Sequence, residues 1–318
     1  MNQGWIYTDR ITATDAGLSV LDYYTSRYRH SSRAEWRDRI LSGQIRQHDQ
    51  AIAPADLLRA GQTLTYHRPP WQEPEVPLEF EVLYEDQDLM AIAKPAGLPV
   101  LPGGSFLTHT LLHQLKLRYS ETPPIPVHRL GRGTSGVMVL GRSPLARSVL
   151  SRQLRESTAA ASDPKASRPI RKTYRALIGP SDLPDSFTIT TAIGKVDHPL
   201  LGYIYAASPT GLSAYSDGRV IHRAPDSTLV EITIRTGRPH QIRIHLAAAG
   251  YPLLGDPLYG IGGTPRQVEP TETGAVPGDI GYHLHAHRLA LPHPRTQEPL
   301  VIVCPAPAAL ALPGSPTT

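Results

Sequence analysis

Two segments concentrate the side chains that could do chemistry. Residues 128–136 read His-Arg-Leu-Gly-Arg-Gly-Thr-Ser-Gly, and residues 236–245 read Thr-Gly-Arg-Pro-His-Gln-Ile-Arg-Ile-His. Both are rich in arginine and histidine, and neither contains a carboxylate. Nowhere in the sequence do paired carboxylates or metal ligands stand at the spacing that glycosidases or metal-dependent nucleases need. Those two reaction classes are therefore the weakest interpretations, and we expect no metal site.

The bulk composition indicates a folded protein with a polyanionic partner. The 318 residues suffice for one large domain and a small one. The net charge of +4 suits nucleic acid, although many unrelated proteins are equally basic. The single cysteine, Cys304, cannot form an intrachain disulfide, and we expect it to be buried. No apolar run reaches the roughly 20 residues that span a membrane, and residues 1–10 are polar. We expect a cytoplasmic protein without membrane contact.

The elements that must position the two segments are short strands with a few helices. From residue 80 onward, apolar runs alternate with turn signals. We expect strands at 80–84, 90–93, 137–140, 173–178, 188–192, 220–222, 229–235 and 301–304, with helices at 108–119, 144–155 and 241–249. Residues 156–169 are small and polar and indicate a loop. Strands outnumber helices without regular alternation, which predicts an α+β fold with a mixed, mostly antiparallel sheet.

Residues 1–70 are expected to form a separate small α+β module, joined by a Pro-rich linker at 71–79 to a domain at 80–318. Ser32 and Glu35 have the spacing of a capping box for a helix that ends near Gly43. Arg33 and Arg37 on this helix suit contacts with phosphates, and Tyr28 and Trp36 could stack on bases. The alternative is a solvated basic face.

The run at 128–136 resembles the His-Arg-Leu-Asp-x-x-Thr-Ser-Gly signature of the RluA-like pseudouridine synthases, with Gly131 in place of the catalytic Asp. Four further blocks resemble the family in its order: 82–98 with Lys-Pro-x-Gly, 171–176 with Lys-x-Tyr, 236–260, and 283–294 with His-Leu-His-Ala. Together they cover residues 80–305 and imply the pseudouridine synthase fold. Residues 1–70 resemble the alpha-L RNA-binding motif, which many pseudouridine synthases carry.

The resemblance implies roles for individual residues. Tyr174 would stack on the base that leaves its sugar and is a candidate proton acceptor, and Arg243 would be the basic partner of the catalytic carboxylate. Arg129 would contact RNA near the flipped nucleotide, while Thr134, Ser135 and Gly136 would shape the turn below the site. The other candidate RNA contacts are Arg132, Arg238 and His240. Isomerisation adds and removes no atoms, so no cofactor is expected.

Gly131 is the departure from the family pattern. Glycine can neither attack a carbon nor move a proton, and Gly131-Arg132-Gly133 is expected to adopt backbone angles closed to aspartate. Arg243 would then need another partner, for which Asp256, Asp86 and Asp88 are candidates. Two hypotheses follow: a monomeric RNA pseudouridine synthase acting on structured RNA, with rRNA favoured over tRNA, or a catalytically inactive RNA-binding protein that retains the fold.

Overall fold

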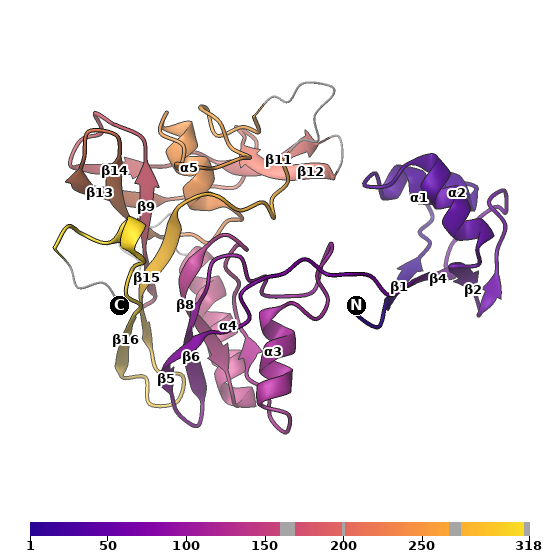
Figure 1. Ribbon diagram of the computed structural model, residues 1–318, viewed down its shortest axis with the longest axis horizontal. Coiled ribbons are helices and arrows are strands. Elements are labelled where there is room, and N and C mark those ends of the chain that lie inside the picture. The colour runs from indigo at the N-terminus through magenta and orange to yellow at the C-terminus, as the bar shows by residue number, and fades with distance from the viewer. Residues whose placement is uncertain (160–168, 199–200, 267–274, 315–318) are drawn as a thin grey trace. The chain divides into compact units, whose positions relative to one another are not determined.

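The computed structural model describes residues 1–159, 169–198, 201–266 and 275–314. The chain forms two compact units. The small unit comprises Met1–Glu73 and Val196–Ile204, and the large unit comprises Pro74–Lys195 and Tyr205–Thr318. Figure 1 labels most of the helices and strands of both units.

The small unit is a four-stranded sheet with two helices. Its elements are β1 (Trp5–Arg10), α1 (Val20–Arg27), α2 (Arg33–Leu41), β2 (Ile45–Gln47), β3 (Gln50–Ala51) and β4 (Thr63–Arg68), and the strand order is β1-β4-β2-β3. The predicted capping box is confirmed: the Ser32 side chain accepts from the Glu35 backbone N–H, and the Glu35 carboxylate accepts from the Ser32 N–H. Strand β1 was not predicted, because Trp5–Arg10 lacks a clean apolar alternation and is mostly exposed.

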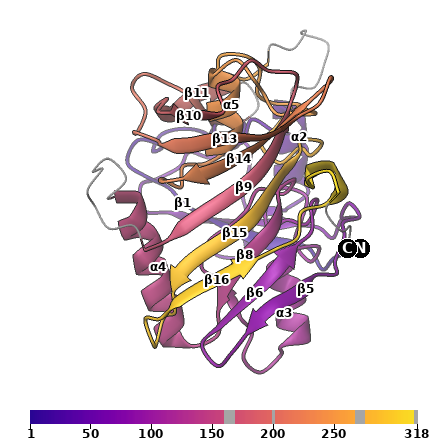
Figure 2. The same cartoon turned by 90° about the vertical axis from the view of Figure 1, so that its left-hand side faces the viewer.

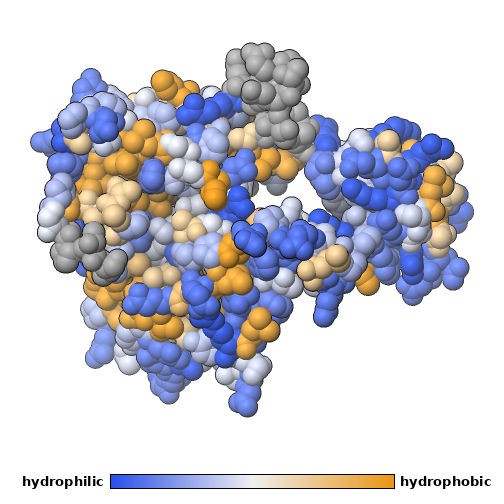
Figure 3. Space-filling model, viewed as in Figure 1, coloured by the Kyte–Doolittle hydropathy of each residue, from blue (hydrophilic) through white to orange (hydrophobic). Residues whose placement is uncertain are grey.

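Aromatic side chains form much of the small unit's core. Trp36 is 1% exposed, packs against Tyr24 and donates its indole N–H to the Tyr28 carbonyl. The prediction that Trp36 stacks on bases is therefore wrong, because its ring has no accessible face. Figure 3 shows a mostly hydrophilic surface on this unit. Arg37 is exposed, and Arg33 is exposed and paired with Asp22.

A long mixed sheet organises the large unit, as predicted for an α+β fold. Within the described residues its strand order is β10-β13-β14-β9-β15-β8-β6-β5, with β16 beside β15 and β7 beside β8. The strands are β5 (Glu81–Glu85), β6 (Leu89–Lys94), β7 (Ile125–Pro126), β8 (Ser135–Gly141), β9 (Arg171–Ile178), β10 (Ser186–Ile189), β13 (Ser216–Arg223), β14 (Thr228–Ile234), β15 (Leu284–Pro292) and β16 (Pro299–Val303). Only the β15–β8 pair is parallel among these pairings. Figure 2 shows the strands side by side.

Alternation along the strands buries both faces of the sheet. On β8, Met138 and Leu140 belong to one core cluster, whereas Val137 and Val139 belong to another. The first cluster includes residues of α3 (Leu111–Arg118) and α5 (Gln241–Ala248), and the second includes residues of α4 (Pro144–Ala159). Helices α3 and α5 therefore cover one face and α4 covers the other.

Some predicted boundaries needed correction. Helix α4 runs to Ala159 instead of ending at residue 155, so the start of the predicted loop is helical, while residues 160–168 lie outside the described part of the chain. The strand predicted at 188–192 ends at Ile189. The β11 (Ile193–His198) and β12 (Gly202–Ala207) ribbon was missed, as was the short β7. In the described residues, every helix is too short or too polar to cross a membrane.

Candidate active site

Three adjacent strands place three of the family-like blocks in one row. Tyr174 on β9 pairs with Ala286 on β15, and Ala286 pairs with Gly136 on β8. Gly136 has φ of +108°, and a Cβ there would lie 2.3 Å from the Ala286 carbonyl oxygen. Only glycine fits this approach. The close approach of Gly136 to Ala286 places the 128–135 segment against β15, beside Tyr174.

Hydrogen bonds within the turn and from a buried lysine fix the turn at 131–134. The Thr134 N–H donates to the Gly131 carbonyl at 3.1 Å, which closes the turn. The buried Lys94 ammonium donates to the carbonyls of Pro95, Leu98 and Arg132 at 2.8, 2.8 and 3.2 Å. This lysine therefore joins the Lys-Pro-x-Gly turn to the 131–134 turn.

His128 has a structural role in the same segment. Its Nε2 accepts from the Val139 N–H at 3.0 Å. Burial, with the nearby Lys172 charge, lowers the pKa of His128 to about 3, so the ring is neutral and suited to accept.

The other segment enters α5 through a turn fixed by Gln241. Its Oε1 accepts from the Thr236 hydroxyl and the Arg238 N–H, and its Nε2 donates to the Tyr215 carbonyl and the Ser216 hydroxyl. Gln241 is 3% exposed with all these groups satisfied. These hydrogen bonds fix the direction in which α5 begins, with its first residues facing the sheet.

Arg243 finds its partner in Asp256. Nε and Nη2 of Arg243 donate to the two carboxylate oxygens at 2.7 and 2.8 Å, and both side chains are almost fully buried. Burial opposes ionisation of Asp256, but the hydrogen bonds and charge of Arg243 outweigh it and lower the pKa of the carboxyl. The acid also accepts from the N–H groups of Leu258 and Tyr259.

The other two candidate acids lie elsewhere. Asp86 accepts from Tyr84 and contacts His293, and Asp88 forms a bidentate pair with Arg295. The sequence named Asp256 as one of three possibilities, and only the fold selects it.

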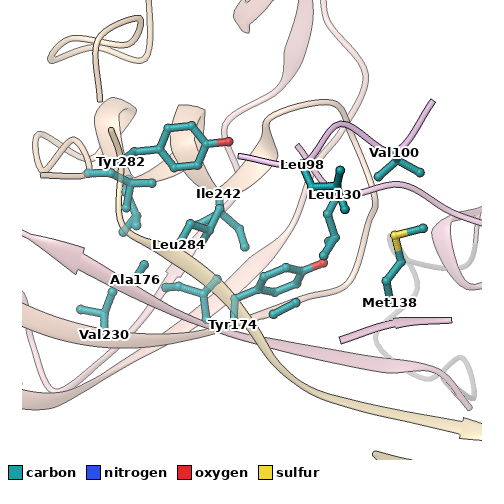
Figure 4. Close-up of a cluster of buried hydrophobic side chains, with 14 of the residues drawn as sticks. Leu98, Val100, Leu130, Met138, Tyr174, Ala176, Val230, Ile242, Tyr282 and Leu284 are labelled. Atoms are coloured by element: carbon teal, nitrogen blue, oxygen red, sulfur yellow. The ribbon is translucent and has the colours of Figure 1, made fainter. Parts of the chain in front are cut away.

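A pocket gathers the predicted residues on the α5 face of the sheet. Its lining comprises Arg129, Leu130, Gly131, Thr134, Tyr174, Ile234, Arg238, His240, Gln241, Ile242, Arg243, Tyr282 and Leu284. Among these described residues there is no carboxylate. Figure 4 shows Tyr174 and Tyr282 with Ile242 and Leu284 between them. Tyr174 is 9% exposed, and burial raises the pKa of its phenol to about 12. A flat neutral ring in an apolar setting suits stacking on a base, whereas a proton-accepting phenolate is disfavoured here.

The expectation about glycine backbone angles is wrong for Gly131 and Gly133. Neither has positive φ, unlike Gly136. Instead, Gly131 is contacted by Tyr282, a residue that the sequence did not indicate as a candidate. A Cβ at Gly131 would lie 2.9 Å from the Tyr282 hydroxyl, and one at Gly133 would lie 2.9 Å from two carbons of the same ring. Tyr282 stands directly before the His-Leu-His-Ala block, so its aromatic type beside a matching motif was the available signal.

The candidate RNA contacts of the large unit surround the pocket. Arg129 is exposed on its wall. Arg132 donates to the Gly278 carbonyl at 2.6 Å and lies against Phe106, and Arg238 donates to the Ser213 carbonyl at 3.1 Å. These two arginines therefore also hold neighbouring loops.

His240 is the N-cap of α5 and has φ of +54°. The Tyr259 hydroxyl donates to the Tyr205 carbonyl, so it accepts from Nδ1–H of His240 at 2.7 Å. Burial lowers the pKa of His240 to about 4, so Nε2 carries no proton at neutral pH. His240 thus contributes a hydrogen-bond acceptor to the pocket lining.

A larger hollow of about 750 Å³ lies over β9, β10, β13 and β14. Four of its charged side chains form two ion pairs, Arg235–Asp217 at 2.5 Å and Arg219–Glu231 at 2.9 Å. It contains none of the predicted site residues. Among the residues that the structure describes, no group of three His, Cys, Asp or Glu side chains is placed to hold a metal ion.

Comparisons with known proteins agree with the fold and the family resemblance. Residues 88–248 match the family model described as RNA pseudouridylate synthase. An uncharacterized RNA pseudouridine synthase of Synechocystis sp. is 52% identical over 294 residues, covering 92% of this chain and 96% of that protein. Ribosomal large subunit pseudouridine synthase D of Neisseria meningitidis serogroup B is 31% identical over 291 residues, covering 88% and 72%.

Among solved structures, human RNA pseudouridylate synthase domain containing 1 has a TM-score of 0.55 at 22% identity, covering 76% of this chain and 89% of that one. The architecture is that of a pseudouridylate synthase domain. By sequence as well as by fold, the chain belongs to the RNA pseudouridylate synthase family.

Proposed function

We propose that this protein is an active RNA pseudouridine synthase that isomerises uridine in structured RNA, with ribosomal RNA as the favoured substrate. The observation that carries the proposal is the convergence of Tyr174, Arg243 and the 128–136 turn on one pocket. The preference for ribosomal RNA is supported by the relative named for the large ribosomal subunit.

The pocket has the parts that a flipped uridine requires. Tyr174 offers a face for stacking, since a stacked base must leave its helix before it can turn over. Arg129 and Arg238 offer charge for the flanking phosphates. Arg243 is fully buried and paired with Asp256, so it holds the shape of the pocket and does not reach out to bind RNA phosphates.

The small unit is proposed to bind RNA through the exposed surface that bears Arg33 and Arg37. Both side chains are exposed, although Arg33 already pairs with Asp22. Phosphate contacts of this kind are independent of sequence, so this unit would add affinity and not choose the uridine. The monomeric state and cytoplasmic location remain predictions.

One observation favours a second candidate, a catalytically inactive RNA-binding protein. The described pocket lining includes no carboxylate, and Asp256, the acid nearest to it through Arg243, has no exposed side-chain surface. This candidate predicts RNA binding without a chemical product.

The experiment compares pseudouridine in cellular RNA from strains with and without the gene. Uridine and pseudouridine have equal mass, so nucleosides are separated by chromatography before mass spectrometry, and modified positions are then mapped. Loss of a defined site that the wild-type gene restores supports the enzyme. An unchanged map, together with RNA binding by the purified protein, supports the second candidate.

A further inference from the structure

Tyr282 occupies the space that a side chain at position 131 would fill. Its hydroxyl lies 2.9 Å from an ideal Cβ on Gly131, which is closer than real Cβ contacts allow. Its ring also covers Gly133, and the whole side chain is 5% exposed. The two glycines and the tyrosine therefore form one packed arrangement, in which a phenolic oxygen stands beside the position of the missing acid.

Two polar groups lie against the Tyr282 side chain. The Thr134 hydroxyl lies 3.3 Å from the Tyr282 hydroxyl and can donate to it. The Arg243 guanidinium carbon lies 4.1 Å from the centre of the Tyr282 ring. A hydroxyl donor beside the oxygen is a group that stabilises an oxyanion, and the Arg243 guanidinium lies over the face of the ring.

The other groups around the pocket do not compete for this role. Tyr174 packs with Leu130 and Ile242 in the apolar cluster, and burial raises the pKa of its phenol to about 12. The charged and titratable groups nearest Tyr282 are Arg243 with Asp256 behind it, Tyr259 against Arg243, and Arg129, Arg238 and His240 on the pocket wall.

We propose that the phenolate oxygen of Tyr282 acts on the ribose of the target uridine in place of the carboxylate that position 131 lacks. This inference rests on the proposed function, since it assigns a residue to the isomerisation.

The step balances without a co-reactant. The step starts from the Tyr282 phenolate, whose oxygen removes the proton from C2′ of the uridine. The electrons of the C2′–H bond form a C1′=C2′ double bond, and those of the C1′–N1 bond leave with the uracil as its anion. The uracil turns over, C5 bonds to C1′, and C2′ recovers the proton from Tyr282. The hydrogen on C5 is then lost and N1 gains one, so the product is an isomer and the phenolate is restored.

The test measures tritium released from RNA that carries uridine labelled at C5, because that hydrogen leaves carbon during the reaction. Tyr282→Phe keeps the ring against Gly133 and Arg243 and removes only the oxygen. We expect at least a 100-fold loss of rate, as for other acid–base groups, with RNA affinity within threefold of wild type. Tyr119→Phe, at the end of α3 and outside the pocket lining, is the matched control and should keep the wild-type rate.

A rescue separates catalysis from packing. In Gly131→Asp/Tyr282→Phe the oxygen that lies 2.9 Å from the new Cβ is gone, and the nearest remaining atom is the Thr134 hydroxyl oxygen at 3.4 Å. We expect this double variant to recover at least tenfold over Tyr282→Phe, because the family's carboxylate then has room. An acid at position 131 of the 131–134 turn would not replace a purely structural tyrosine.

The outcomes are distinguishable. Release by wild type with an unaltered rate in Tyr282→Phe overturns the role of Tyr282 and leaves the proposed function standing. A rate lost in proportion to RNA affinity or to thermal stability also overturns the catalytic role. No release by wild type from any ribosomal or transfer RNA overturns the proposed function itself, and the inference with it.

Discussion

Arg243 and Asp256 form a bidentate ion pair, 13 residues apart in sequence, in which both side chains are nearly inaccessible to water. The arginine that the family resemblance assigns to a catalytic carboxylate is therefore already paired with an acid behind the pocket. Although residue 131 is glycine, the buried Arg243 charge has a partner. The pocket therefore keeps its shape without an acid in the 131–134 turn.

We expect Asp256→Asn to destabilise the large unit by about 3–5 kcal/mol, because it leaves the buried Arg243 charge without a counter-ion. The amide retains the shape of the side chain, so the loss would report charge and not packing. Urea unfolding at pH 7 measures the change. Asp226→Asn is the control, since Asp226 is exposed and should change stability by less than about 0.5 kcal/mol. An equal effect of the two variants would contradict the assignment.

Replacing Tyr174 should separate its ring from its hydroxyl. Tyr174→Ala removes the proposed stacking face and should weaken binding of the target RNA by about 1–3 kcal/mol. Tyr174→Phe retains the face and should bind within threefold of wild type, because the buried phenol is neutral at pH 7. Fluorescence titration with a labelled uridine-containing hairpin measures both. Equal weakening by the two variants would assign the role to the hydroxyl.

Gly136→Ala should prevent correct pairing of β8 with β15. The new Cβ would meet the Ala286 carbonyl oxygen at 2.3 Å on a backbone with φ of +108°, and we expect a loss of about 3–5 kcal/mol. Gly179→Ala is the control, since that glycine has ordinary φ and nothing within 4 Å. Thermal unfolding followed by circular dichroism compares the two. Wild-type stability in Gly136→Ala would mean that the two strands are further apart than described here.

The Asp88–Arg295 pair predicts a specific pH dependence. Hydrogen bonds from Arg295 and Ser143 lower the pKa of Asp88 from 3.8 to about 2. A carboxyl with a lowered folded-state pKa contributes stability that is complete above about pH 4 and is lost as the pH falls through about 2. Arg295→Met should therefore destabilise the protein by about 1–2 kcal/mol at pH 7 and by almost nothing at pH 2.

The control for this pair is Arg152→Met. Arg152 lies 3.9 Å from Glu156 in an exposed pair on α4, which should contribute under about 0.5 kcal/mol at any pH. Denaturant unfolding across this pH range measures both variants. A difference between wild type and Arg295→Met that stays constant from pH 7 to pH 2 would rule out the titration of Asp88 as its cause.

The sequence alone determined the family and the local structure. Motifs such as the Ser32–Glu35 capping box depend on residues three apart, so their geometry follows from backbone hydrogen bonding within one turn. Alternation of apolar residues likewise predicted most strands, because neighbouring side chains on a strand face opposite ways. The 128–136 and 236–245 blocks supply most of the residues that line the pocket.

Tertiary structure decided which residues meet across long separations. Asp256 could not be chosen over Asp86 and Asp88 from sequence, because the choice depends on where α5 and the 255–260 turn pack. Tyr282 was overlooked because it packs against Gly131 and Gly133, about 150 residues earlier, and local patterns carry no information about such a contact. Helix and strand formation is governed by neighbours in sequence, whereas the chemistry of this pocket depends on the register of β8, β15 and β9, which is fixed only when the whole sheet assembles.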